Sequence, residues 1–131
     1  MNENNIELTL SELEKKHKTT FLMKSNELLY VVKYMENISD VVELYVNFDQ
    51  VKFSCLGQYA ESEISFANHN IQSIQCDKIQ VPISLLKLFT KSLDTLEPVQ
   101  ISFGHGVPFS LFYKIIDVGF IQFFYKNAQT I

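Results

Sequence analysis

"LLKLFTKSLDTLEPVQISFGHGVPFSLFYKIIDVGFIQFFYKN", from Leu85 to Asn127, begins with a helical repeat and continues as three runs that alternate like β-strands. The helix is predicted over 82–96, with Pro82 in its first turn and Pro98 just after its end. The strands are predicted over 99–104, 109–116 and 119–126. This end of the chain should therefore fold as one helix followed by three antiparallel strands.

The preceding residues repeat the same order of elements. A short strand is predicted over 19–23 and a helix over 25–39, with Ser25 as its N-cap. The i, i+3, i+4, i+7 spacing predicts one apolar face for this helix, formed by Leu28, Val31, Val32 and Met35. Three strands follow at 41–48, 51–57 and 61–68, and a longer one at 71–83 leads into the second helix. The chain thus predicts two β-α-β-β-β units in an α+β fold, with both helices on one face of antiparallel sheets.

Composition narrows the functional classes. The chain has 131 residues and a net charge of −4, and all 11 basic residues are lysine, with neither arginine nor tryptophan. Without arginine forks, sequence-specific reading of DNA bases is not expected. Cys55 and Cys76 lack the spacing of a redox or zinc motif, so two buried reduced thiols are predicted. No apolar run resembles a signal peptide or a membrane span, which favours an intracellular protein that does not bind a membrane.

An enzyme would need a recognisable constellation of reactive side chains. His17, His69 and His105 lie in three separate segments, and no nucleophile-elbow motif accompanies them. The cysteine and histidine spacing fits no zinc pattern. His105, between two glycines, is predicted to be a turn residue. We therefore expect no catalytic residue, no metal and no cofactor.

Two stretches carry a family resemblance. "DQVKFSCLGQYAESEISF" (49–66) resembles the DGVKFSxxG pattern of DNA sliding clamps. The stretch quoted at the start resembles their helix, strand, "VP" turn, "YKI", aspartate, glycine and aromatic closing strand. Over residues ~19–126 the chain resembles the C-terminal domain of the proliferating cell nuclear antigen family. That implies a single clamp domain at 19–131, with 1–18 resembling the end of an interdomain connector.

The resemblance implies a face toward DNA. In such clamps the helices line the inner wall of a ring and contact DNA through basic side chains. The matching exposed positions here are Lys33, Lys87 and Lys91, of which Lys87 and Lys91 are spaced i, i+4 and therefore share one exposed face. A few lysines on one face give weak contact with phosphate that depends on salt and not on base sequence.

The resemblance also implies a groove for partner peptides, formed by the connector, the "VP" turn and the closing strand. The matching residues are Leu10, Leu13, Val107, Pro108, Phe124 and Tyr125. Because neighbouring side chains in a strand point to opposite faces, Phe123 and Phe124 cannot both be in the core. One of them, together with Tyr125 near the end of the strand, should remain exposed as part of an apolar patch. The tail after Lys126 departs from the family pattern, so partner affinity or choice can differ.

Subunit contact is implied for the last strand of the first unit, within 57–68, which in clamps pairs across a subunit boundary. Its residues here are Tyr59, Glu61, Glu63, Ile64 and Phe66. We expect this strand to be a sheet edge, with Glu61 and Glu63 opposing unwanted pairing.

The function implied is that of a DNA polymerase processivity factor that helps to encircle duplex DNA and tethers replication and repair proteins. Its expected partners are DNA, polymerases and other proteins with the clamp-interacting motif, a clamp loader, and further clamp subunits or domains in a ring. The expected location is the nucleus in a eukaryote, or else the cytoplasm or a viral replication site. Two alternatives stay open: a clamp-fold interaction module similar to the checkpoint clamp, and a small enzyme. Whether the domain belongs to a longer chain or assembles from short ones is also open.

Overall fold

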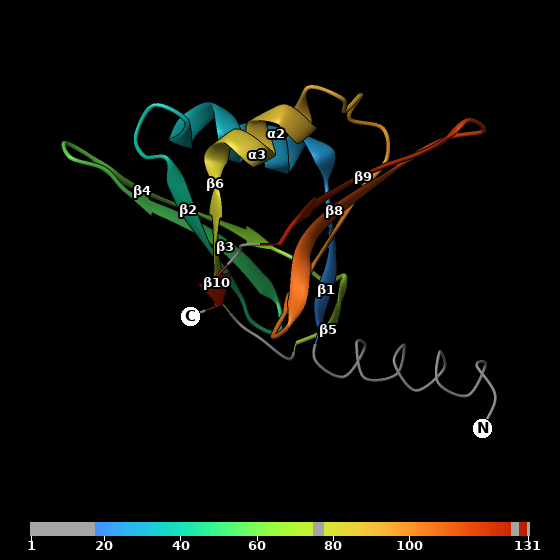
Figure 1. The fold of residues 1–131 in the computed structure, drawn as a ribbon, viewed down its shortest axis with the longest axis horizontal. Coiled ribbons are helices and arrows are strands. Elements are labelled where there is room, and N and C mark those ends of the chain that lie inside the picture. Colours follow the sequence, from blue (N-terminus) through green and yellow to red (C-terminus); the bar gives the residue numbers. More distant parts are fainter. Residues whose placement is uncertain (1–17, 75–77, 127–128, 131) are drawn as a thin grey trace.

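The computed structural model describes residues 18–74, 78–126 and 129–130 as two antiparallel sheets beneath a pair of helices (Figure 1). The elements are β1 (Lys18–Met23), α2 (Ser25–Met35), β2 (Val41–Val46), β3 (Gln50–Leu56), β4 (Glu61–Ala67), β5 (Ile71–Ser73), β6 (Lys78–Pro82), α3 (Ile83–Thr90), β7 (Val99–Gly104), β8 (Val107–Ile115), β9 (Gly119–Tyr125) and β10 (Gln129–Thr130). The predicted α+β class and the doubled β-α-β-β-β order are confirmed.

The two units exchange their first strands. One sheet has the order β5-β1-β7-β8-β9, and the other has the order β10-β6-β2-β3-β4. Strand β1 of the first unit pairs along its length with β7 of the second, from Lys18↔Gly104 to Met23↔Val99. Strand β6 of the second unit pairs with β2 of the first. Each sheet therefore contains strands from both units, and neither unit holds a complete sheet alone.

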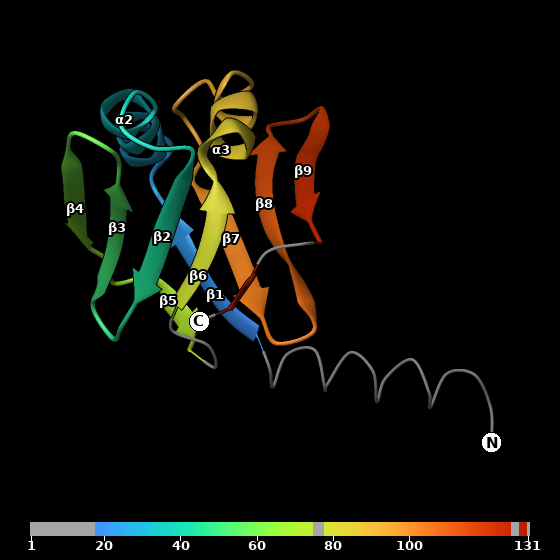
Figure 2. The same cartoon turned by 60° about the vertical axis from the view of Figure 1, so that its left-hand side comes forward.

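The core lies between the sheets and under the helices. Alternate residues of β2 and β3 are fully buried, among them Leu44 and Phe53, and the other sheet contributes residues such as Ile101 and Leu111. The predicted apolar face of α2 is confirmed, since Leu28, Val31, Val32 and Met35 are all buried. Figure 2 shows α2 and α3 side by side on one side of the molecule, so both helices cover the same end of the core.

The second helix is shorter than predicted. It ends at Thr90 instead of 96, so Pro98 does not terminate it. The residues that follow form a loop with two long-range anchors: the Tyr113 hydroxyl donates to the Asp94 carboxylate, and the Ser25 hydroxyl donates to the Glu97 carbonyl. These contacts with distant parts of the chain replace the helical hydrogen bonds that the local pattern predicted.

Ser25 is not the N-cap of α2. The cap position is Lys24, and Ser25 is the first helical residue, buried and bonded to Glu97. Its hydroxyl thus anchors the loop before β7 instead of accepting from the helix. Pro82 likewise lies at the N-cap of α3, as the last residue of β6, and not in the first turn.

The predicted strand 71–83 is two strands in different sheets. Strand β5 pairs with β1, where the Ser73 hydroxyl donates to the Lys18 carbonyl at 2.7 Å, and β6 pairs with β2. The physical reason is that β1 already pairs with β7 and β2 with β3, which leaves one side of each strand open for hydrogen bonding. Strand β5 fills the open side of β1, and β6 fills that of β2.

Two turns in the second unit use backbone with positive φ. Gly106 has φ 71° in the β7–β8 turn, and the neighbouring His105 is a turn residue as predicted. In the β8–β9 turn the positive φ, 62°, belongs to Asp117 and not to Gly119. Aspartate tolerates this left-handed conformation better than most residues.

Part of the expected domain plan lies outside the described residues. This applies to the connector-like segment as far as residue 17, with Leu10 and Leu13, and to Cys76. Lys18, the last residue of that segment, already belongs to β1. Among the described residues, no helix is long and apolar enough to cross a membrane.

Candidate nucleic-acid interface and partner surfaces

The exposed side of the helix pair carries the three lysines that the sequence singled out. Lys33 belongs to α2, Lys87 to α3, and Lys91 caps the C-terminal end of α3; all three are exposed. Figure 2 shows the two helices side by side on one side of the molecule, so all three exposed lysines belong to this helix pair. Each also lies near the C-terminal end of its helix, where a cation interacts favourably with the helix dipole.

The charge of this surface is partly offset. Lys87 Nζ lies 3.4 Å from the Glu36 carboxylate, and Lys33 Nζ lies 5.4 Å from the centroid of the Tyr34 ring. Tyr34 in turn packs against Tyr30, with ring centroids 4.4 Å apart. The roles of Glu36, Tyr34 and Tyr30 were not predicted from the sequence, although the i, i+4 spacing of the tyrosines was a signal for their pairing. The Lys87–Glu36 pair joins two helices, and no local spacing reveals it.

Strand β4 is the open edge of its sheet, as predicted. Ser62, Ile64 and Phe66 are half-buried on its inner face, and Glu61 and Glu63 are exposed on its outer face. The Glu63 carboxylate lies 3.8 Å from Lys52 Nζ on β3. Tyr59 is 91% exposed in the β3–β4 turn. The predicted contact residues are therefore placed on or next to an edge that can accept another strand.

The hydrogen bonding of this hairpin shows which backbone groups face outward. Gly57 N–H donates to Ala60 O, and Asn68 N–H donates to Asp49 O. Since bonded and non-bonded pairs alternate in an antiparallel ladder, the Phe53↔Ile64 pair is a bonded one. The N–H groups of Glu63 and Ser65 then point away from β3, toward the open edge. Strand β9 forms the corresponding edge of the other sheet, which the sequence analysis did not single out.

The structure divides the predicted peptide groove between two faces. Phe124 is 56% exposed. The expectation that Tyr125 is exposed beside it is wrong, because Tyr125 lies on the inner face opposite the buried Phe109 and packs, half-buried, against the core. Phe123 also packs against the core, with its ring 5.2 Å from that of Phe89, so the expectation that only one of the neighbouring phenylalanines is exposed is confirmed. By alternation along β8, Pro108 shares the face of Phe124, and Val107 shares the face of Tyr125. Leu10 and Leu13 lie outside the described residues.

An outer aromatic patch extends from Phe124. It comprises Phe112, Phe120 and Phe124; Phe112 and Phe120 stack with ring centroids 5.3 Å apart, and Phe120 is 63% exposed. The face of β8 and β9 that carries Phe124 therefore presents three aromatic rings, with Ser110, Gln122 and Lys114 among them. Exposed apolar surface of this kind is typical of interaction sites.

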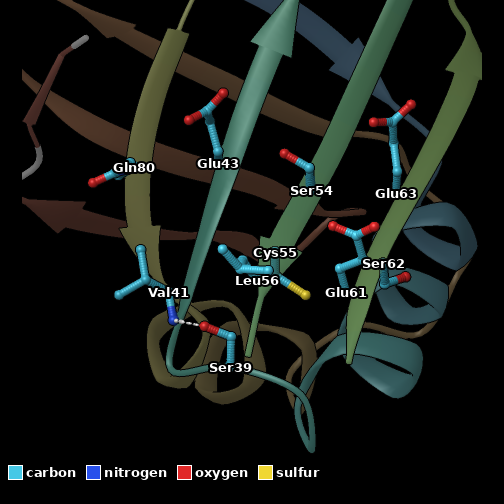
Figure 3. Close-up of a pocket in the computed structure, with 10 residues that line it drawn as sticks. All are labelled: Ser39, Val41, Glu43, Ser54, Cys55, Leu56, Glu61, Ser62, Glu63 and Gln80. Carbon is cyan, nitrogen blue, oxygen red and sulfur yellow. Dashed lines mark hydrogen bonds between the residues drawn. The ribbon is translucent and has the colours of Figure 1, made fainter. Parts of the chain in front are cut away.

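A polar pocket of about 700 Å³ lies on the other sheet, near the α2–β2 loop (Figure 3). Its lining combines three carboxylates with hydroxyl, amide, thiol and apolar side chains. The lining residues are Ser39, Val41, Glu43, Ser54, Cys55, Leu56, Glu61, Ser62, Glu63 and Gln80. Cys55 is a free, buried thiol, and burial raises its pKa. Because the thiolate is the reactive form, a raised pKa makes Cys55 a poor nucleophile. Within the described residues, no group of three or more His, Cys, Asp or Glu side chains is placed to hold a metal.

Comparison with known proteins points to one family. Residues 12–128 match the family described as "Proliferating cell nuclear antigen, C-terminal domain". The proliferating cell nuclear antigen of Dictyostelium discoideum is 28% identical over 113 residues, covering 78% of this chain and 44% of that protein.

Two solved structures share the fold. The crystal structure of the Thermococcus kodakaraensis protein of the same name has a TM-score of 0.66 at 21% identity, covering 82% of this chain and 46% of that one. The Entamoeba histolytica structure has a TM-score of 0.73 at 17% identity, covering 84% and 45%. This chain thus matches less than half the length of each relative. The family match covers most of the chain and the fold agrees with it, so the chain belongs to the proliferating cell nuclear antigen family and corresponds to its C-terminal domain.

Proposed function

We propose that this domain is part of a DNA sliding clamp, a processivity factor that helps to encircle duplex DNA and tethers replication and repair proteins to it. The observation that carries the proposal is the family match over residues 12–128. The domain organisation proposed with it is a connector-like segment at 1–18 and one clamp domain at 19–131. Proteins of this family are clamps and not enzymes, which supports a role without catalysis.

The DNA-facing surface would be the helix pair, with Lys33, Lys87 and Lys91 as its cations. Their exposure and their shared side of the molecule support this role. Sparse lysines give loose electrostatic contact with phosphates, which lets a protein slide along DNA.

Ring closure would use strand β4, with other clamp subunits or domains supplying the partner edge. The open edge of β4 and the partial match to the longer relatives support this proposal. A clamp loader would open and close such a ring on DNA. The site of action would be the nucleus in a eukaryote, or else the cytoplasm or a viral replication site.

Partner peptides would bind on the side of β8 and β9 that carries Pro108 and Phe124. The exposed ring of Phe124 and the outer aromatic patch support an apolar socket there. Pro108 fixes its own φ, which lowers the ordering cost of binding. The connector residues Leu10 and Leu13 would complete this groove, which would receive polymerases and other proteins that carry the clamp-interacting motif. Val107 and Tyr125 lie on the opposite face of the sheet, so they would support the socket from behind and would not contact the peptide.

One observation favours a second candidate, a clamp-fold interaction module without a replicative role. Glu36 offsets Lys87 on the helical surface, so the attraction to DNA is weaker than the number of lysines implies. Loading onto primed circular DNA separates the two candidates, since the interaction module would not be loaded together with a replicative polymerase.

A processivity assay tests the proposal. The chain, assembled with the subunits that complete its ring, is loaded on primed circular DNA, and product length per polymerase binding event is measured. Changing Lys33, Lys87 and Lys91 to Glu should shorten the products. A control with Lys18, Lys24 and Lys78 changed to Glu has the same net charge, and these lysines lie outside both helices and outside β4, β8 and β9. Equal products from the two triple variants would reject the DNA-facing assignment.

A further inference from the structure

The exposed side of α2 carries two tyrosines that the proposed function does not use. Tyr30 and Tyr34 lie four residues apart, so they are neighbours on one side of the helix. Their ring centroids are 4.4 Å apart with an angle of 47° between the planes. Tyr30 is 49% exposed and Tyr34 is 46% exposed. Two large rings are therefore held together at the surface, beyond the buried face of the helix.

A hydrogen bond joins the two side chains of this pair. A side-chain hydrogen bond with Tyr34 raises the pKa of Tyr30 above its ordinary value, so Tyr30 stays protonated and uncharged. A hydroxyl can donate one hydrogen bond and accept others. The pair thus presents neutral polar groups on side chains that have only two χ angles each and therefore lose little conformational freedom when they bind.

The pair lies beside a cation. Lys33 Nζ is 5.4 Å from the centroid of the Tyr34 ring, a distance at which the ammonium and the ring attract each other. Lys87, on α3, is paired with Glu36. Lys33 therefore has an aromatic partner that leaves its charge uncompensated, and that charge lies next to the two hydroxyl groups.

We propose that Tyr30 and Tyr34, together with Lys33, form a contact for the backbone of duplex DNA. The hydroxyl proton that the Tyr30–Tyr34 hydrogen bond leaves unused donates to a phosphate oxygen, and Lys33 supplies the positive charge beside it. This inference rests on the proposed function, because it places α2 toward DNA. Tyrosine hydroxyls are among the groups that contact phosphates in protein–DNA complexes. A neutral donor beside one lysine suits an anionic partner and adds attraction that does not depend on release of counterions.

The difference in salt dependence provides the test. The full chain is titrated with a fluorescently labelled duplex over a series of low salt concentrations. In the double variant Tyr30→Phe, Tyr34→Phe the rings and the Lys33 contact remain and only the hydroxyls are lost. Its affinity should fall by roughly three- to tenfold, with an unchanged slope of log affinity against log salt. Lys33→Gln should instead lower that slope by about 1.

Tyr59→Phe is the matched control, because Tyr59 is 91% exposed in the β3–β4 turn and lies on no helix; it should bind the duplex like the wild type. If the double variant also binds like the wild type while Lys33→Gln binds more weakly, the tyrosine contact is wrong and the DNA-facing surface stands. If neither change alters duplex binding, or the chain binds no duplex at low salt, the proposed DNA-facing surface fails as well. Preferential binding of a single strand by the wild type, unaffected by loss of the hydroxyls, would replace phosphate contact with base stacking.

Discussion

Gly57, between β3 and β4, occupies a position where the backbone of another segment approaches closely. A Cβ added there would lie 1.9 Å from the carbonyl oxygen of Ile38 and 2.9 Å from its carbon. Both atoms belong to the backbone after α2, so they cannot rotate away as a flexible side chain would. The close contact requires glycine, although the φ angle at Gly57 is not positive.

Gly57→Ala should therefore destabilise the domain by about 1–3 kcal/mol, the usual cost of overpacking. Urea unfolding followed by circular dichroism would measure the change. Gly119→Ala is a suitable control, since a Cβ at Gly119 meets nothing within 4 Å. A Gly57→Ala variant as stable as the control would show that the α2–β2 loop moves away without cost.

At the scale of elements, the hydrogen bonding of β4 predicts different effects for proline at two neighbouring positions. Ile64 donates its N–H to β3, whereas the N–H of Ser65 faces the open edge. Proline is tolerated on an edge strand where the missing N–H would face solvent. Ser65→Pro should therefore leave the domain folded but block the pairing of β4 with another subunit. Ile64→Pro should unfold the hairpin instead.

Sedimentation of the wild-type chain over a range of concentrations, alone and with a full-length clamp subunit, would measure that pairing. Thermal unfolding of each variant would show whether the domain itself is intact. A folded Ser65→Pro variant that associates as well as the wild type would exclude β4 as the contact strand.

Strand β9 offers a second contrast, between neighbours on opposite faces. Phe124→Ala removes an exposed ring, so it should weaken binding of a clamp-interacting peptide by more than ~1 kcal/mol, as interface anchors commonly do. Its effect on stability should be small. Tyr125→Ala removes a ring that packs against the core and should lower stability as well. Calorimetry on both folded variants would compare the affinities; unchanged binding by Phe124→Ala would place the socket elsewhere.

The elements were predictable where local periodicity determines them. Alternation identified the strands of both hairpins, and the i, i+3, i+4 pattern identified the buried face of α2. The end of α3 was not predictable, because Asp94 and Glu97 are held by Tyr113 and Ser25, which are far away in the sequence. The division of 71–83 into β5 and β6 was not predictable for the same reason, because it depends on which strand in each sheet lacks a neighbour.

The candidate site was predictable from the sequence in the same respect, where local spacing determines which side chains are exposed. The spacing of Lys87 and Lys91 predicted a shared exposed face, and alternation predicted that one of two adjacent phenylalanines in β9 is outside. Which of the two is exposed depends on the strand's position against the core. The Lys87–Glu36 pair depends on how the two helices pack.

At the scale of the whole molecule, the exchange of strands between the units predicts a single unfolding transition. Strand β1 cannot leave β7, nor β6 leave β2, without opening a sheet that contains both units. Circular dichroism and tyrosine fluorescence should therefore report the same urea midpoint. Leu44→Ala in one sheet and Ile101→Ala in the other should each lower that midpoint for both probes, since both side chains are fully buried. Separate midpoints would mean that the two sheets unfold independently.

The same exchange has a consequence for synthesis on the ribosome. Residues 18–23 emerge long before residues 99–104, with which they pair. Until β7 has been translated, β1 lacks that neighbour, and β2 likewise lacks β6 until the middle of the chain is complete. The nascent first half therefore exposes unpaired strand edges, which are prone to aggregation. Because the closing contacts are distant in sequence, the domain should complete its fold only after the last strands leave the exit tunnel, and should do so slowly.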